Sequence, residues 1–129
     1  MTSPEALNEI ARQAVDSAIG VHSAPGPGLL ESTYQACLTH ELRKRGLELK
    51  TQVGLPVVYD GVKLELGYRI DILIAGSVIL EIKAIDGIAP IHRAQLLSYL
   101  RLSGCRLGLL MNFNVPLMKD GIVRMVNGL

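Results

Sequence analysis

The first part of the chain carries apolar residues at every third or fourth position, the period of an amphipathic helix. This pattern covers residues 4–21 and recurs over about residues 29–45. The run Pro25-Gly26-Pro27-Gly28 separates the two segments, because proline cannot donate a backbone hydrogen bond and glycine favours turns. The same period returns over residues 90–103 and stops at a glycine. The pattern therefore predicts three helices.

Between the second and the third of these segments the period shortens to two, which is typical of strands. The predicted strands cover residues 47–53, 57–59, 62–66, 68–74 and 77–85, followed by 106–111 and 122–126. Asp60-Gly61 is a turn signal that joins two of them as a hairpin. This order of elements indicates an α/β or α+β sandwich, in which helices cover a sheet. No long linker interrupts the pattern, so we expect residues 1–129 to form a single domain.

Charged residues gather on one face of the hairpin predicted for residues 68–85. Alternate side chains of a strand share a face. The apolar face is expected to carry Tyr68, Ile70, Ile72 and Ile74 from the first strand and Val78, Leu80, Ile82 and Ala84 from the second. The opposite face carries Arg69, Asp71, Glu81 and Lys83.

The register of this hairpin decides whether its carboxylates meet. A three-residue loop centred on Gly76 places Asp71 opposite Glu81, with Cβ atoms ~5 Å apart. A two-residue turn would instead direct Glu81 into the core, where an unpaired carboxylate is costly. We therefore expect the first register.

Two facing carboxylates repel each other unless a cation lies between them. Their hard oxygen atoms suit Mg²⁺ or Mn²⁺. Lys83 follows Glu81 by two residues on the same face, where it can orient a water molecule or stabilise a phosphoryl oxygen. On spacing alone, a structural arrangement is the more common one, in which Arg69 and Lys83 form salt bridges with the two carboxylates.

Two of the predicted helices add polar candidates. Gln95 and Tyr99 share a stripe with His92, and both can reach a phosphate or orient a catalytic group, although a solvated face would show the same stripe. Glu31 lies at the boundary of a buried helix face, where it either has a function or pairs with the helix N-terminus. The side chains expected to face the core are Ala94, Leu97 and Leu100 on the third helix and Leu30, Tyr34, Cys37, Leu38 and Leu42 on the second.

The composition narrows the class of protein. Of 129 residues, 49 % are hydrophobic, which excludes disorder of the whole chain. No apolar run approaches the ~18 residues of a membrane span and no export signal is visible, so we expect a cytoplasmic protein without a membrane partner. The net charge is +1, but residues 1–41 hold one basic and five acidic residues, while residues 42–129 hold 12 basic and seven acidic ones. This asymmetry leaves room for an anion-binding face.

Several ordered motifs together resemble one family. The segment Gly28-Leu29-Leu30-Glu31-Ser32-Thr33-Tyr34 matches the pattern of the GxxExxY proteins, which are placed in the PD-(D/E)xK nuclease superfamily. The other matching segments are Tyr68-Arg69-Ile70-Asp71, Leu80-Glu81-Ile82-Lys83-Ala84, the Gln95/Tyr99 pair and residues 107–113. The resemblance spans about residues 22–113, and Ile70 stands where the superfamily's name has a proline.

This resemblance implies a restriction-endonuclease-like core, with a central mixed β-sheet flanked by helices. The ligands that it implies for a Mg²⁺ or Mn²⁺ ion are Asp71, Glu81, the Ile82 carbonyl and Glu31. It further implies that Lys83 serves the attacking water, and that Gln95 and Tyr99 support the site.

The sequence therefore predicts metal-dependent hydrolysis of phosphodiester bonds in nucleic acid, with DNA favoured over RNA. The alternative is a catalytically silent binding module with the nuclease fold, or a subunit of a larger nucleic-acid-processing complex. The high apolar content of so small a chain also favours a homodimer.

Overall fold

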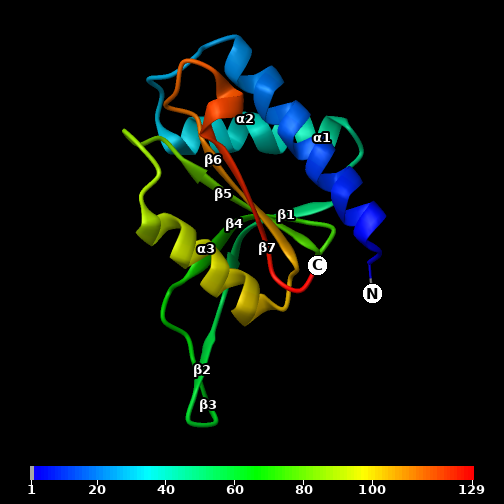
Figure 1. Cartoon of the computed structure of the whole chain (residues 1–129), viewed down its shortest axis with the longest axis vertical. Coiled ribbons are helices and arrows are strands. Elements are labelled where there is room, and N and C mark those ends of the chain that lie inside the picture. Colours follow the sequence, from blue (N-terminus) through cyan, green and yellow to red (C-terminus); the bar gives the residue numbers. More distant parts are fainter. Residues whose placement is uncertain (1) are drawn as a thin grey trace.

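The computed structural model describes residues 2–129 (Figure 1). The helices are α1 (Pro4–Ser23), α2 (Glu31–Lys44) and α3 (Pro90–Ser103), with a short 3-10 helix η1 (Met118–Gly121). The strands are β1 (Leu49–Gly54), β2 (Val57–Tyr59), β3 (Val62–Leu64), β4 (Arg69–Ile74), β5 (Val78–Lys83), β6 (Leu107–Asn112) and β7 (Ile122–Val126). Each predicted helix and strand is present, with its ends shifted by at most two residues.

Five of these strands form one mixed sheet in the order β1-β4-β5-β6-β7. The neighbours β5 and β6 run parallel and are connected through α3, whereas the other neighbouring pairs are antiparallel. β2 and β3 form a separate hairpin, which projects away from the body of the molecule at the bottom of Figure 1.

Apolar side chains fill both faces of the sheet. α1 and α2 cover one face, where Leu38 and Leu42 pack in a cluster with Leu80. α3 covers the other face, where Leu96 packs in a second cluster with Ile79. β5 and β6 are therefore buried on both sides, and the predicted class, a central mixed sheet flanked by helices, is confirmed.

Local interactions set the ends of the helices much as the sequence predicts. The Ser3 hydroxyl caps α1 by accepting a hydrogen bond from the Ala6 amide at 3.1 Å. α3 ends at Gly104, whose φ of 77° lies in the left-handed region that favours glycine. None of the described helices is long and apolar enough to cross a membrane.

The hairpin of β4 and β5 has the predicted register. Ile74 lies opposite Val78, so the connection is a three-residue loop, and its central Gly76 has a φ of 62°. Continued along both strands, this register brings Asp71 opposite Glu81. The reason for expecting it was incomplete, because Glu81 is only 4 % exposed in this register as well.

The alternation of faces within β4 differs from the prediction. Ile72 and Ile74 pack beneath α1 and α2, but Ile70 lies in the cluster beneath α3. The change occurs at Asp71. The β1–β4 ladder pairs Thr51 with Ile72 and Val53 with Ile70, but it leaves out Gln52 and Asp71 between them. Gln52 has a left-handed φ of 51° at this interruption of the ladder, next to the point where the buried side chains of β4 change face.

Two helix faces also differ from the prediction. On α3, Leu96, Tyr99 and Leu100 are the buried residues, whereas Ala94 is exposed and Leu97 is half-buried. On α2, Leu30 is 74 % exposed and Cys37 is exposed, because the helix buries a narrower stripe than its apolar composition suggests.

Candidate active site

A tight turn leads into α2 and places Glu31 at the first position of the helix. The hydroxyl of buried Tyr34 donates to the Gly26 carbonyl at 2.5 Å and accepts from the Leu29 amide at 3.1 Å. The Tyr34 ring stacks on Phe113, with ring centroids 4.6 Å apart. These contacts tie the turn to the core and fix the backbone of Glu31.

β4 and β5 separate at the end of their shared ladder, and two carboxylates fill the gap. The last regular pair is Ile72 with Leu80. Beyond it, the Asp71 amide donates to Glu81 Oε2 at 2.9 Å, and the Ile82 amide donates to Asp71 Oδ2 at 2.8 Å. Each carboxylate accepts a hydrogen bond from the partner strand, so both side chains are held in place.

No basic side chain neutralises this carboxylate pair directly. Among the described residues, no Lys or Arg nitrogen lies within 4.0 Å of a carboxylate oxygen of Asp71 or Glu81. The structural alternative, a salt-bridge ladder with Arg69 and Lys83, is therefore not formed.

The pKa values of three acidic residues, Glu31, Asp71 and Glu81, are raised, chiefly by burial. Burial, followed by the charge of Asp71, raises the pKa of Glu81 to about 8. Burial also raises the pKa of Asp71, although the hydrogen bond from Ile82 opposes the shift. The pKa of Glu31 is raised by burial and then by Asp71. Lys83 lowers all three pKa values, so its amino group acts on the same site.

The end of β5 fixes the backbone of Lys83. Lys83 pairs with Asn112 of β6, and its carbonyl accepts a hydrogen bond from the Phe113 amide at 2.9 Å. The buried Asn112 amide group holds the following loop through two hydrogen bonds to the backbone of Ile85, at 3.1 and 3.0 Å. Sequence reasoning missed this role of Asn112, which a buried polar residue at the end of an apolar strand could have suggested.

Two glutamines that sequence reasoning also missed contact Asp71. Gln35 Nε2 donates to the Asp71 carbonyl at 3.3 Å, and Gln52 Nε2 lies 3.5 Å from Asp71 Oδ1 and donates to Gln35 Oε1 at 3.2 Å. Gln35 follows Glu31 by one helical turn, so its spacing was a usable signal. No local sequence pattern predicts the left-handed backbone of Gln52.

The α3 candidates Gln95 and Tyr99 are joined to each other by a hydrogen bond. Gln95 Nε2 donates to the Tyr99 hydroxyl at 3.2 Å. Tyr99 is 6 % exposed, and its pKa is raised by burial and then by the charge of Glu81. Tyr99 belongs to the same buried cluster as Ile70, the residue before Asp71, and Gln95 is hydrogen-bonded to Tyr99. His92 instead accepts a hydrogen bond from the Ala89 amide through Nδ1, at the start of α3.

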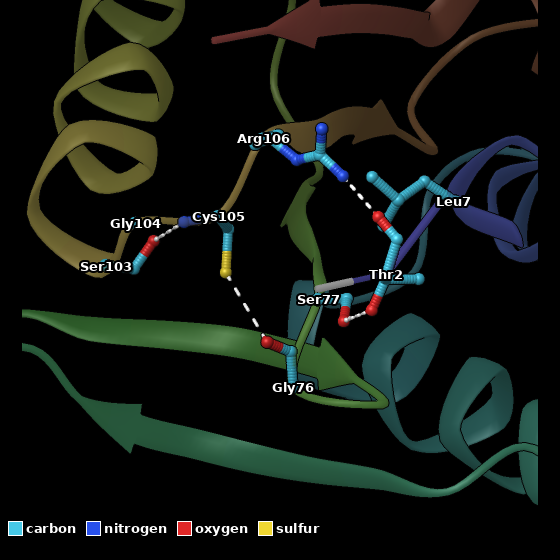
Figure 2. A pocket seen from close by; sticks show the side chains of 8 residues that line it. All are labelled: Thr2, Leu7, Gly76, Ser77, Ser103, Gly104, Cys105 and Arg106. Atoms are coloured by element: carbon cyan, nitrogen blue, oxygen red, sulfur yellow. Dashed lines mark hydrogen bonds between the residues drawn. The ribbon is translucent and has the colours of Figure 1, made fainter. Parts of the chain in front are cut away.

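A hollow of about 230 Å³ at the other end of the sheet holds none of the predicted site residues. Figure 2 shows its walls, where Arg106 donates to the Thr2 carbonyl and the Thr2 and Ser77 hydroxyls lie 3.1 Å apart. The Cys105 thiol points to the Gly76 carbonyl, 3.8 Å away. These contacts join the N-terminal segment to the loops before β5 and β6.

The fold and the paired carboxylates are those expected of a nuclease-like domain, and comparison with known families agrees. The chain matches the PD-(D/E)XK nuclease superfamily over residues 8–125 and belongs to it. Neither the curated proteins nor the solved structures that were searched contained a match.

Members of this superfamily typically use a divalent metal, and the residues present fit one. Asp71 and Glu81 offer hard oxygen atoms, and Glu81 Oε1 accepts no hydrogen bond from any described residue. Within residues 2–129, no three acidic, histidine or cysteine side chains cluster as a complete metal site. This is compatible with Mg²⁺, which commonly takes one or two carboxylates and completes its shell with water.

Proposed function

We propose that this protein is a metal-dependent phosphodiesterase that cleaves nucleic acid, and that it belongs to the GxxExxY group of the superfamily. The observation that carries the proposal is the pair Asp71 and Glu81 where β4 and β5 separate. Glu81 is buried, Asp71 is half-buried, and among the described residues neither has a basic partner within 4.0 Å. A carboxylate pair with raised pKa values costs free energy in the folded state. Such a cost is common at sites that bind a cation or a reacting group.

The ligands proposed for a Mg²⁺ or Mn²⁺ ion are Asp71, Glu81 and the Ile82 carbonyl. Glu31 would contribute through a water molecule of the ion, because the three carboxylates do not gather closely enough to bind it together. When bound, the ion would supply Lewis-acid chemistry and positive charge at the scissile phosphate. The hydrogen bonds from the backbone hold Asp71 and Glu81 in place before any ligand arrives. Little reorganisation is then needed during the reaction.

The remaining candidates act on the water and the phosphate. Lys83 has an amino group that can donate to the attacking water and offset charge on a phosphoryl oxygen. Tyr99 accepts a hydrogen bond from Gln95, so its own hydroxyl proton is free to be donated toward a phosphate oxygen.

The test is cleavage of labelled DNA and RNA, single-stranded and duplex, with Mg²⁺, with Mn²⁺ and with a chelator. We expect wild-type cleavage only with a divalent metal, on DNA in preference to RNA. Asp71→Asn, Glu81→Gln and Lys83→Ala should each reduce the rate about 100-fold or more.

Lys44→Ala is the matched control, because Lys44 lies at the far end of α2 from Glu31 and pairs with Glu41 at 3.5 Å. It should cleave like the wild type. Unchanged cleavage by all three site variants would refute the mechanism. A folded wild type that binds nucleic acid but never cleaves it would instead identify a silent binding module.

A further inference from the structure

A hollow of about 360 Å³ lies beside the candidate active site, between the outer face of α3 and the base of the β2–β3 hairpin. We infer that it receives an unpaired nucleobase next to the scissile phosphate. This inference rests on the proposed function, and it narrows the substrate to single-stranded or locally unpaired nucleic acid.

The walls of the hollow suit the flat apolar faces of a base. Tyr68, 45 % exposed, meets the ring of Tyr99 edge-on, with centroids 6.3 Å apart and planes at 64°. Ile91 and Leu102 of α3 line the same hollow and are 70 % and 43 % exposed. Exposed aromatic and aliphatic side chains around one concavity form a surface on which a base can stack.

The hollow also presents polar groups that match the edge of a base. Gln95 Nε2 donates a hydrogen bond to the Tyr99 hydroxyl, and Gln95 Oε1 accepts no hydrogen bond from any described residue. Ser98 contributes a hydroxyl to the lining. His92 accepts the Ala89 amide through Nδ1 at 2.8 Å, so its neutral ring carries a proton on Nε2 and is a donor there. Base edges carry both donors and acceptors.

Two residues connect the hollow to the candidate active site. Gln95 and Tyr99 line the hollow, and Tyr99 belongs to the same buried cluster as Ile70, the residue that precedes Asp71 in β4. No acidic side chain lines the hollow, so none would repel the phosphates of a strand bound there. In a duplex, the edge and faces of that base are already occupied by pairing and stacking.

The experiment measures binding separately from cleavage. The full-length Lys83→Ala variant is titrated into labelled single strands and duplexes of one sequence, made as DNA and as RNA, and anisotropy is recorded with Mg²⁺. We expect the single strand to bind about tenfold more tightly than the duplex. Adding Ser98→Trp, which fills the hollow, should reduce single-strand affinity about tenfold and leave duplex affinity unchanged.

Ala94→Trp is the matched control, since Ala94 is exposed on the same helix but does not line the hollow. Tyr68→Ala is a second variant that removes a half-exposed wall rather than filling the space. A 2-aminopurine base in the strand should change its emission on binding, and Ser98→Trp should abolish that change. Preference for one of the two nucleic acids would show which sugar backbone the site accepts.

Several results would overturn the inference: no binding of either single strand, equal effects of Ser98→Trp and Ala94→Trp, or equal losses on single strand and duplex. A change in sedimentation of free Ser98→Trp would also overturn it, because a second copy of the chain would then cover the hollow. If the wild type cleaves nucleic acid but Ser98→Trp leaves single-strand affinity unaltered, only the base site is rejected. If Ser98→Trp weakens single-strand binding but the wild type does not cleave, only the catalytic proposal is rejected.

Discussion

The folded protein favours the neutral acid form of Glu81 over the carboxylate, because burial and the charge of Asp71 raise its pKa to about 8. Between its unfolded pKa near 4.5 and about 8, the folded state holds a proton that the unfolded state has lost. The free energy of unfolding in the presence of a chelator should therefore fall as pH rises through this window. A single group contributes at most about 1.4 kcal/mol per pH unit.

Urea unfolding at pH 5, 6, 7 and 8 measures this slope. Glu81→Gln should flatten the pH dependence of the free energy of unfolding, since a neutral amide has no proton to lose. Glu65→Gln is the control, because Glu65 is exposed just after β3, and it should leave this pH dependence unchanged. Identical slopes for wild type and Glu81→Gln would mean that Glu81 titrates normally in the folded protein.

Gln52 combines an unfavourable backbone with a contact to Asp71, and two substitutions separate these effects. Its φ of 51° costs a residue with a Cβ roughly 1 kcal/mol that glycine does not incur. Gln52→Gly should therefore be more stable than Gln52→Ala by about that amount. Both variants lose the amide beside Asp71, and each should reduce cleavage or Mn²⁺ affinity about tenfold.

The readouts are urea midpoints together with cleavage rates or calorimetric Mn²⁺ titrations. Full activity in Gln52→Gly would show that the amide does not position Asp71. Equal stability of the glycine and alanine variants would show that the left-handed backbone relaxes when the side chain is removed.

At the scale of elements, one glycine sets how closely η1 approaches β6. A Cβ added to Gly121 would lie 2.1 Å from the Asn112 carbonyl oxygen, which is a backbone atom and cannot swing aside. Gly121→Ala should lower the free energy of unfolding by about 2 kcal/mol or more. Because Asn112 holds the loop after β5, the same change should also slow cleavage.

Gly20→Ala is the opposite case within α1. A Cβ there meets nothing within 4 Å, and alanine is the better helix former, so a gain of about 0.5–1 kcal/mol is expected. Chemical denaturation of both variants tests the pair. A wild-type midpoint for Gly121→Ala would contradict the close approach.

Most elements could be predicted because their signals are local. Pro90 and Gly104 mark the ends of α3, and a loop around Gly76 gives the register of β4 and β5. The face of Ile70 and the exposure of Ala94 could not be read from periodicity, because the first depends on the backbone of Gln52. The second depends on how α3 is rotated against the sheet, which tertiary packing decides.

The residues of the candidate site also fall into those that local sequence patterns predict and those that they do not. Asp71 and Glu81 lie within one hairpin, so alternation and register alone are enough to predict that they face each other. Lys83 follows Glu81 on the same strand without contacting either carboxylate. Gln35 and Gln52 come from α2 and β1, and their contacts with Asp71 exist only once those elements have packed on β4. Catalytic roles for all of these residues stay predictions until activity is measured.

At the scale of the molecule, the sheet separates two apolar clusters, and both need β5. Leu80 and Ile82 pack toward α1 and α2, whereas Ile79 packs toward α3. Glu81 lies in this doubly buried strand, so its charge is far more costly than that of a surface carboxylate. Because both clusters share the strand, we propose that residues 1–129 unfold as a single domain in one cooperative transition.

This arrangement predicts that the candidate site destabilises the protein without metal and stabilises it with metal. At pH 8 with a chelator, Glu81→Gln should melt at a higher temperature than wild type, because it removes a buried charge. With Mn²⁺ at about 100 times its Kd the wild type should gain about 2.7 kcal/mol, or roughly 10 °C for a chain of this length. Glu81→Gln should not respond, so the order of the two melting temperatures should reverse. Calorimetry with and without Mn²⁺ measures both values, and an unchanged order would mean that Glu81 does not bind the metal.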